Sequence, residues 1–220
     1  MRRKLSLLLC LVMLLSGVFL PSCKEEEKDR EYDAEVVLRE AALLVERSKL
    51  INFIFWGDGI PVREGEEAEK LGTYTEADGS FLEQHGIDSV DKLKKMTSEV
   101  YDKAFCNTIF QTKLAALQDS DGNRISLVRY YQKTSKDESG NEIQGPIMVH
   151  TQSESICEAD PVYHTDTLVI TGVSGQIVHL TVEVSYGTDS TERITVPVDL
   201  VEEENGWRLV SPTYVGKIKK

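Results

Sequence analysis

The chain has 220 residues, of which 40% are hydrophobic and 28% charged, with a formal net charge of −12 at pH 7. This length predicts one domain or two small ones, and the hydrophobic content excludes a wholly disordered chain. The excess of acidic residues argues against nucleic acid as a partner, because such a surface repels phosphate backbones.

The first segment has the pattern of a secretory signal peptide. Residues 1–4 carry three basic side chains, and Leu5 to Leu20 is an almost uninterrupted apolar run. This run of sixteen residues is shorter than the ~20 residues that cross a bilayer as a helix. We therefore expect residues 1–22 to be a cleaved leader, whose removal takes the net charge from −12 to −15.

The residues Leu20-Pro-Ser-Cys23 resemble the lipobox of bacterial lipoproteins. Residues 23–31 then form an acidic tether, since everything after the cysteine up to Glu31 is charged and no apolar residue occurs. The resemblance implies that Cys23 carries a diacylglyceryl group, becomes the mature N-terminus and holds the protein at the outside of a bacterial membrane. Acyl chains such as palmitate suffice for this, at ~0.8 kcal/mol per buried methylene.

Two cysteines remain in the mature chain. Cys10 leaves with the leader and Cys23 is acylated, which leaves Cys106 and Cys157. Outside the membrane this pair can oxidise to a disulfide. Alternatively, each thiol behaves as a small hydrophobic group, because the count of cysteines says nothing about the distance between them.

The first predicted element of the mature chain is a helix that starts near Tyr32. Its apolar stripe has helical spacing and consists of Val37, Ala41, Leu44, Ile51 and Phe55, widened by Val36, Leu43, Leu50 and Ile54. The helix is expected to stop at Gly57-Asp-Gly59, with Pro61 just beyond.

A loop is predicted over residues 60–80, with a short strand near residues 73–75 and a turn over residues 75–79. A second helical region begins near Asp88 or Ser89, either of which can act as an N-cap. It continues in a longer piece through Val100 and Ala104.

The rest of the chain reads as strands. The expected strands cover residues 124–132, 144–152, 167–173, 176–186, 192–202 and 207–210. Asn205-Gly206 is a strong hairpin signal, and the alternation after it predicts that Trp207 is a core residue. Helices followed by strands predict an α+β fold, with N-terminal helices packed on a curved C-terminal antiparallel sheet. Residues 32–220 are expected to form a single globular domain.

No motif in the chain indicates catalysis, a metal site or a cofactor site. Asp119-Ser-Asp-Gly-Asn123 lacks two anchoring oxygens of a calcium loop and reads as a turn. The four histidines, which are His85, His150, His164 and His179, have no zinc-ligand spacing. Neither cysteine lies in a nucleophile elbow, and no G-x-S-x-G occurs. We therefore expect a non-catalytic protein.

The segment from Phe53 to Pro61 is the densest combination of aromatic and turn residues. Its aromatic residues are expected to pack into the core, as aromatic residues usually do. The turn after them is a candidate recognition loop that carries carboxylates, and both interpretations can hold together. This predicted loop consists of Trp56, Gly57, Asp58, Gly59, Glu64, Glu66 and Glu67.

Four short motifs resemble a known family. They are Phe55-Trp-Gly-Asp-Gly-Ile-Pro61, Val100-Tyr101, Gly206-Trp-Arg-Leu209 and Ser211-Pro-Thr-Tyr214. In this order the series resembles the IseA-type inhibitors of cell-wall DL-endopeptidases, and the layout is similar to the nuclear-transport-factor-2-like cone fold.

The resemblance implies a protein that plugs the substrate groove of a peptidoglycan-cutting cysteine endopeptidase, with acidic residues that imitate stem-peptide carboxylates. An alternative is a cone-shaped sheet that binds a small ligand or an envelope component. A third, weaker interpretation is a hydrolase with an unrecognised site.

Overall fold

The computed structural model describes residues 32–63, 65, 74–114, 128–157, 160–186, 191–214 and 216. The predicted leader, Cys23 with its tether, and Glu64, Glu66 and Glu67 lie outside these residues, as does the turn at residues 119–123. The elements are α2 (Ala34–Phe55), β1 (Tyr74–Glu76), α3 (Gly79–Gln84), α4 (Val90–Ser98), α5 (Lys103–Ile109), the π-helix η1 (Phe110–Leu114), β2 (Tyr130–Lys136), β3 (Glu142–His150), β4 (Pro161–Ser174), β5 (Ile177–Tyr186), β6 (Ile194–Glu203) and β7 (Gly206–Leu209). The fold is α+β, as predicted.

The long helix α2 starts where a side chain satisfies its first backbone donors. The Asp33 carboxylate accepts hydrogen bonds from the N–H groups of Glu35 and Val36, at 2.9 and 3.3 Å. The predicted apolar stripe is confirmed, since its five residues are all buried. Leu43, which was expected to widen the stripe, is instead 47% exposed. It lies about a third of a turn away from the centre of the stripe.

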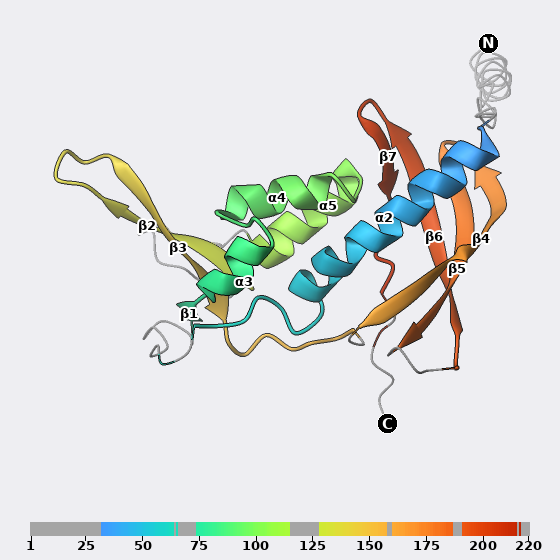
Figure 1. Ribbon diagram of the computed structural model, residues 1–220. Helices are drawn as coiled ribbons and strands as arrows, with labels where there is room; N and C mark the ends of the chain where they lie inside the picture. Colours follow the sequence, from blue (N-terminus) through green and yellow to red (C-terminus); the bar gives the residue numbers. More distant parts are fainter. Residues whose placement is uncertain are drawn as a thin grey trace, which may run out of the picture.

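A four-stranded antiparallel sheet with the order β4-β5-β6-β7 carries α2 across one face (Figure 1). Alternate residues of β5 are buried in the core on that face: Val178, Leu180, Val182 and Val184. The residues between them, such as His179, are only partly buried on the opposite face. The sheet therefore has one covered face and one open face, as antiparallel sheets often do.

Trp207 belongs to the covered side, as its alternation predicted. It is 8% exposed, and the ring of Tyr32 packs against it edge-on at 5.0 Å between centroids. This contact joins the start of the described chain to the last strand of the sheet.

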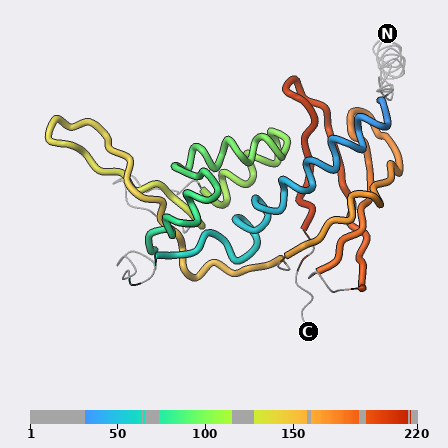
Figure 2. The backbone as a smooth tube through the Cα atoms, in the orientation of Figure 1, coloured from blue at the N-terminus to red at the C-terminus, as the bar shows by residue number. Residues whose placement is uncertain are grey.

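The first two predicted strands form a separate sheet, which corrects the expectation of a single one. Its order is β1-β3-β2, and the β2–β3 hairpin projects away from the rest of the molecule (Figures 1 and 2). Strand β3 pairs with β2 along most of its length and with β1 only through residues 148–150. The chain then crosses to the second sheet.

The helices between the two sheets follow capping signals. Ser89 caps α4 through Lys92, as predicted, with its hydroxyl accepting from the backbone N–H. Asp78 caps α3, a helix that follows the predicted turn and was not predicted. One continuous cluster of buried apolar residues joins α2, α4, α5 and both sheets, and Phe81 and Leu82 of α3 pack against it. Among the described helices, none is long and apolar enough to cross a membrane.

Candidate functional site

The motifs that carry the family resemblance meet around one side chain, Trp56. Its ring stacks on Phe105 at 5.9 Å and packs on Tyr214 at 5.2 Å and on Tyr101 at 6.4 Å. The Tyr101 segment in turn pairs with Leu209 at the end of β7. Trp56 itself is only 8% exposed. The aromatic part of the predicted recognition loop is thus a core element, and the turn after it is built on a packed base.

A buried arginine holds the end of α2. Arg129 is 5% exposed, and its guanidinium donates to the carbonyl oxygens of Phe55 and Gly57 at 3.0 and 2.6 Å. No carboxylate among the described residues pairs with it. The helix has no basic residue of its own in its last turn, so Arg129 supplies the cation that helix C-termini favour.

The neighbouring Tyr130 ties both sides of the turn together. Its hydroxyl donates to the Ile54 carbonyl at 2.7 Å and accepts from the Ile60 N–H at 3.0 Å. The Arg129 Nε also donates to this hydroxyl, at 3.1 Å. Burial raises the pKa of Tyr130, so the phenol stays protonated at neutral pH. One hydroxyl group therefore holds both the residue before the turn, Ile54, and the residue after it, Ile60.

Two glycines make this close packing sterically feasible. A Cβ at Gly57 would lie 2.9 Å from the Phe53 carbonyl oxygen. Gly59 has a φ of +86°, and a Cβ there would lie 2.5 Å from Arg129 Nη2. No other residue type combines this conformation with this approach. We call residues Gly57–Gly59 the tip.

Asp58 is the exposed residue of the tip. Within the described part of the chain its carboxylate makes no hydrogen bond or ion pair. It lies at the rim of two hollows. One, the outer depression, is lined by Asp58, Ile60, Pro61, Val62, Arg129, Val149, His150, Thr151 and Ser153. The tip thus presents a single carboxylate on a rigid base.

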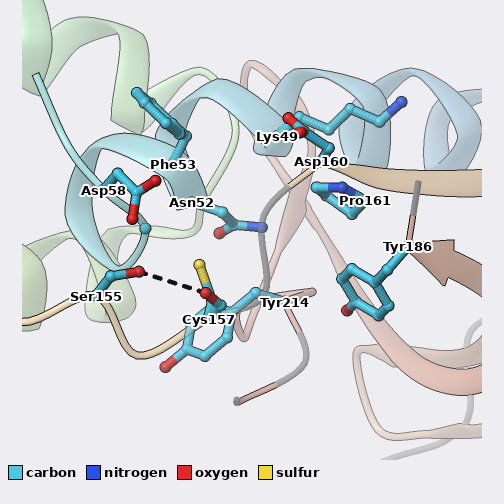
Figure 3. A pocket seen from close by; sticks show the side chains of 11 residues that line it. Lys49, Asn52, Phe53, Asp58, Ser155, Cys157, Asp160, Pro161, Tyr186 and Tyr214 are labelled. Atoms are coloured by element: carbon cyan, nitrogen blue, oxygen red, sulfur yellow. Dashed lines mark hydrogen bonds between the residues drawn. The ribbon is translucent and has the colours of Figure 1, made fainter. Parts of the chain in front are cut away.

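The second hollow, which we call the narrow pocket, lies on the α2 side of Asp58 (Figure 3). It encloses about 380 Å³ including its open mouth, and it fits only a small group between its walls. Its wall is more apolar than polar. It is lined by Lys49, Asn52, Phe53, Gly57, Asp58, Ser155, Cys157, Asp160, Pro161, Tyr186 and Tyr214.

A buried polar network supports the floor of this pocket. The Thr213 hydroxyl lies 2.7 Å from that of Ser48 and 3.0 Å from that of Tyr163, and it accepts from Asn52 Nδ2 at 3.0 Å. Tyr101 donates to the Asn52 side-chain oxygen at 2.6 Å. Burial raises the pKa of Tyr163 and raises that of Tyr101 well above its ordinary value. Both phenols are therefore protonated and hold α2, β4 and the C-terminal segment together.

Cys106 and Cys157 are both buried, and they are not joined in a disulfide in the structure. Burial raises the pKa of Cys106 to about 11, and its thiol donates to the Tyr101 carbonyl at 3.3 Å. A thiol with such a pKa is protonated at neutral pH and is a poor nucleophile. Cys157 lines the narrow pocket, and no histidine is among the residues that line it.

The predicted recognition residues therefore separate into two groups. The structure brings Trp56, Gly57, Asp58 and Gly59 together at one rigid turn, whereas the three glutamates lie outside the described residues. Sequence reasoning missed Arg129, the residue that fixes the tip. Its signal in the sequence was weak, an arginine directly before Tyr130 in a predicted strand, because an arginine in a strand is usually exposed.

A scan of protein-family models finds no match to the chain, and a search of curated proteins finds none either. Among the described residues, no three histidine, cysteine or acidic side chains gather as metal ligands. The geometry of the tip and its two hollows is therefore what supports a function.

Proposed function

We propose that the protein is a lipid-anchored, extracytoplasmic binding protein that recognises its partner through Asp58, without chemistry at that site. The signal-like leader and the lipobox-like Cys23 support the location. The observation that carries the binding role is the combination of an exposed carboxylate with a fully braced backbone. Arg129 and Tyr130 hold four backbone groups around the tip, and a side chain at Gly59 would collide with both of them.

Rigid presentation of a charge favours tight and specific binding. A loop that is ordered before binding loses little conformational entropy when it meets its partner. The chain as a whole is strongly acidic, so long-range attraction steers it toward a basic surface. A carboxylate at the tip of such a surface then fixes the register of the contact.

The partner that fits these properties is a peptidoglycan endopeptidase with a groove for acidic stem peptides. The resemblance to IseA-type inhibitors supports this choice. In this proposal Asp58 imitates a stem-peptide carboxylate, and the adjoining narrow pocket accepts a small side-chain group of the enzyme. The charged residues Glu64, Glu66 and Glu67 follow the tip in the chain and add to its acidic sequence.

The test is hydrolysis of purified cell wall by the organism's endopeptidases, with and without an excess of residues 32–220. Asp58→Asn should raise the inhibition constant about tenfold, or ~1.4 kcal/mol, and flatten its dependence on salt. Asp166→Asn is the matched control, since Asp166 is also exposed but lies on β4. Unchanged hydrolysis by every enzyme, or equal effects of both variants, would contradict the proposal.

A second candidate is binding of a small ligand in the narrow pocket. Its mostly apolar wall, which also includes a few polar side chains such as Asn52 and Asp58, is typical of ligand sites. In that case soluble cell-wall fragments should raise the melting temperature of the protein in a concentration-dependent way. Endopeptidase inhibition without such a shift would favour the first candidate.

A further inference from the structure

A chain of hydrogen bonds on the open face of the four-stranded sheet joins a serine, a histidine and an aspartate. The Ser174 hydroxyl lies 2.8 Å from His179 Nε2, and His179 Nδ1 lies 2.7 Å from Asp199 Oδ1. The side chains of His179 and Asp199 are 38% and 33% exposed, and Ser174 is exposed. All three face solvent on the side of the sheet away from α2, at a distance in the fold from Asp58.

The register of the strands produces this arrangement. His179 on β5 stands directly opposite Asp199 on β6 and opposite Gly172 on β4. Ser174 is two residues beyond Gly172, so its side chain emerges on the same face as that of His179. The diagonal separation between the two is within reach of a histidine side chain. Sequence spacing alone places Ser174 and His179 in one hairpin but says nothing about Asp199.

The hydrogen bonds define the tautomer of the neutral imidazole. The Asp199 carboxylate can only accept, so Nδ1 of His179 carries the proton in the neutral ring. Nε2 then presents its lone pair to the Ser174 hydroxyl, which donates. This is the tautomer that a general base needs beside a serine nucleophile.

We propose that Ser174 is a nucleophile activated by His179, that Asp199 positions the imidazole, and that this face reacts with esters of short acyl groups. The half-buried pair Ile177 and Val201 lies next to His179 and Asp199 in the register and offers an apolar surface to the acyl chain. The face is open, so small activated esters suit it better than one large substrate. This inference does not depend on Asp58 or on the proposed partner.

The reaction proceeds in two balanced steps. Ser174 Oγ attacks the carbonyl carbon of the ester, and its proton passes to His179 Nε2. The ester C–O bond breaks, and the leaving alkoxide takes that proton and departs as the alcohol, with the acyl group left on Ser174. Water then attacks the acyl carbon and gives a proton to His179. The bond to Oγ breaks, Oγ regains the proton, and the carboxylic acid is released.

A second serine–histidine pair in the same sheet serves as an internal control for Ser174 and His179. His164 Nε2 lies 3.0 Å from the hydroxyl of Ser185, on the same sheet. No carboxylate among the described residues forms a hydrogen bond or ion pair with this imidazole, and Ser185 is only 3% exposed. Ser185 thus has the serine–histidine hydrogen bond without the aspartate and without access to solvent, so it should not react.

The experiment uses the full chain in mild detergent, a fluorophosphonate probe with peptide mass mapping, and the hydrolysis of p-nitrophenyl acetate. We expect the label on Ser174 and its loss in Ser174→Ala. His179→Gln should lower the labelling rate at least about a hundredfold, the scale of general base catalysis. Asp199→Asn should lower it at least about tenfold, because the imidazole loses its orienting partner. Ser185→Ala should label like the wild-type protein.

Asp199→Glu separates a positioning role from a structural one, since it keeps the carboxylate and should recover part of the rate that Asp199→Asn loses. Circular dichroism and melting temperatures of all variants check that the sheet is intact. Absence of label on the wild-type protein overturns the proposal. Labelling that persists in Ser174→Ala overturns it as well. A rate that is equal in wild type, His179→Gln and Asp199→Asn shows ordinary surface reactivity, and this also overturns it.

Discussion

Replacing Gly59 with alanine tests whether the tip is braced as closely as its contacts indicate. Gly59 has a φ of +86°, and a Cβ there would lie 2.5 Å from Arg129 Nη2 and 2.6 Å from the Tyr130 hydroxyl. Both atoms take part in the hydrogen bonds that hold the tip. The added methyl group should therefore strain the backbone and displace its braces together.

Alanine substitutions at two other glycines separate the cost of backbone strain from the cost of displacing Arg129 and Tyr130. Gly86 has a φ of +63° but open space around it, and Gly79 has neither a positive φ nor a neighbour within 4 Å. Gly86→Ala should cost about 1–2 kcal/mol of unfolding free energy from the left-handed backbone alone. Gly79→Ala should be neutral or stabilise by up to about 1 kcal/mol. Gly59→Ala should cost about 2.5–5 kcal/mol, because weakened hydrogen bonds from the Arg129 guanidinium add about 1.5–3 kcal/mol to the cost of the backbone.

The measurement is urea unfolding of the three variants, followed by the fluorescence of the two buried tryptophans, Trp56 beside the tip and Trp207 in the sheet. From the most to the least stable, the variants should rank Gly79→Ala, Gly86→Ala and Gly59→Ala. The slope of the unfolding free energy against urea concentration should be the same in all three. A Gly59→Ala variant that unfolds at the same urea concentration as Gly86→Ala would show that Arg129 and Tyr130 move aside without cost. The tip would then not be rigid, and the reasoning would fail.

Two further predictions concern the core and the anchor. Trp207→Ala should cost about 3–5 kcal/mol of stability, because the indole is buried and packs on Tyr32; an unchanged melting temperature would contradict this packing. Cys23→Ser should release the protein from membranes or leave an uncleaved precursor. A processed Cys23→Ser protein that still partitions into detergent would show that the anchor lies elsewhere.

The sequence by itself determined the local elements of this fold. The helical stripe from Val37 to Phe55 and the alternation in β5 are periodic patterns, and each needs only its own residues to define which face is apolar. The Asn205-Gly206 turn likewise defined the hairpin that buries Trp207. The α+β class follows from the order of these elements. Helix α3 was missed because its six residues are too few to show a period.

Only the tertiary structure decided what these elements build together. Arg129 is 74 residues away from Phe55 in the chain, yet its guanidinium satisfies the carbonyl at the end of α2. Asp199 meets His179 because two strands pair in one register, and a shift of one residue would turn the aspartate to the other face. Such contacts depend on strand pairing and on packing between distant segments. The periodicity of a sequence records which face of an element is buried, but it does not record which partner lies there.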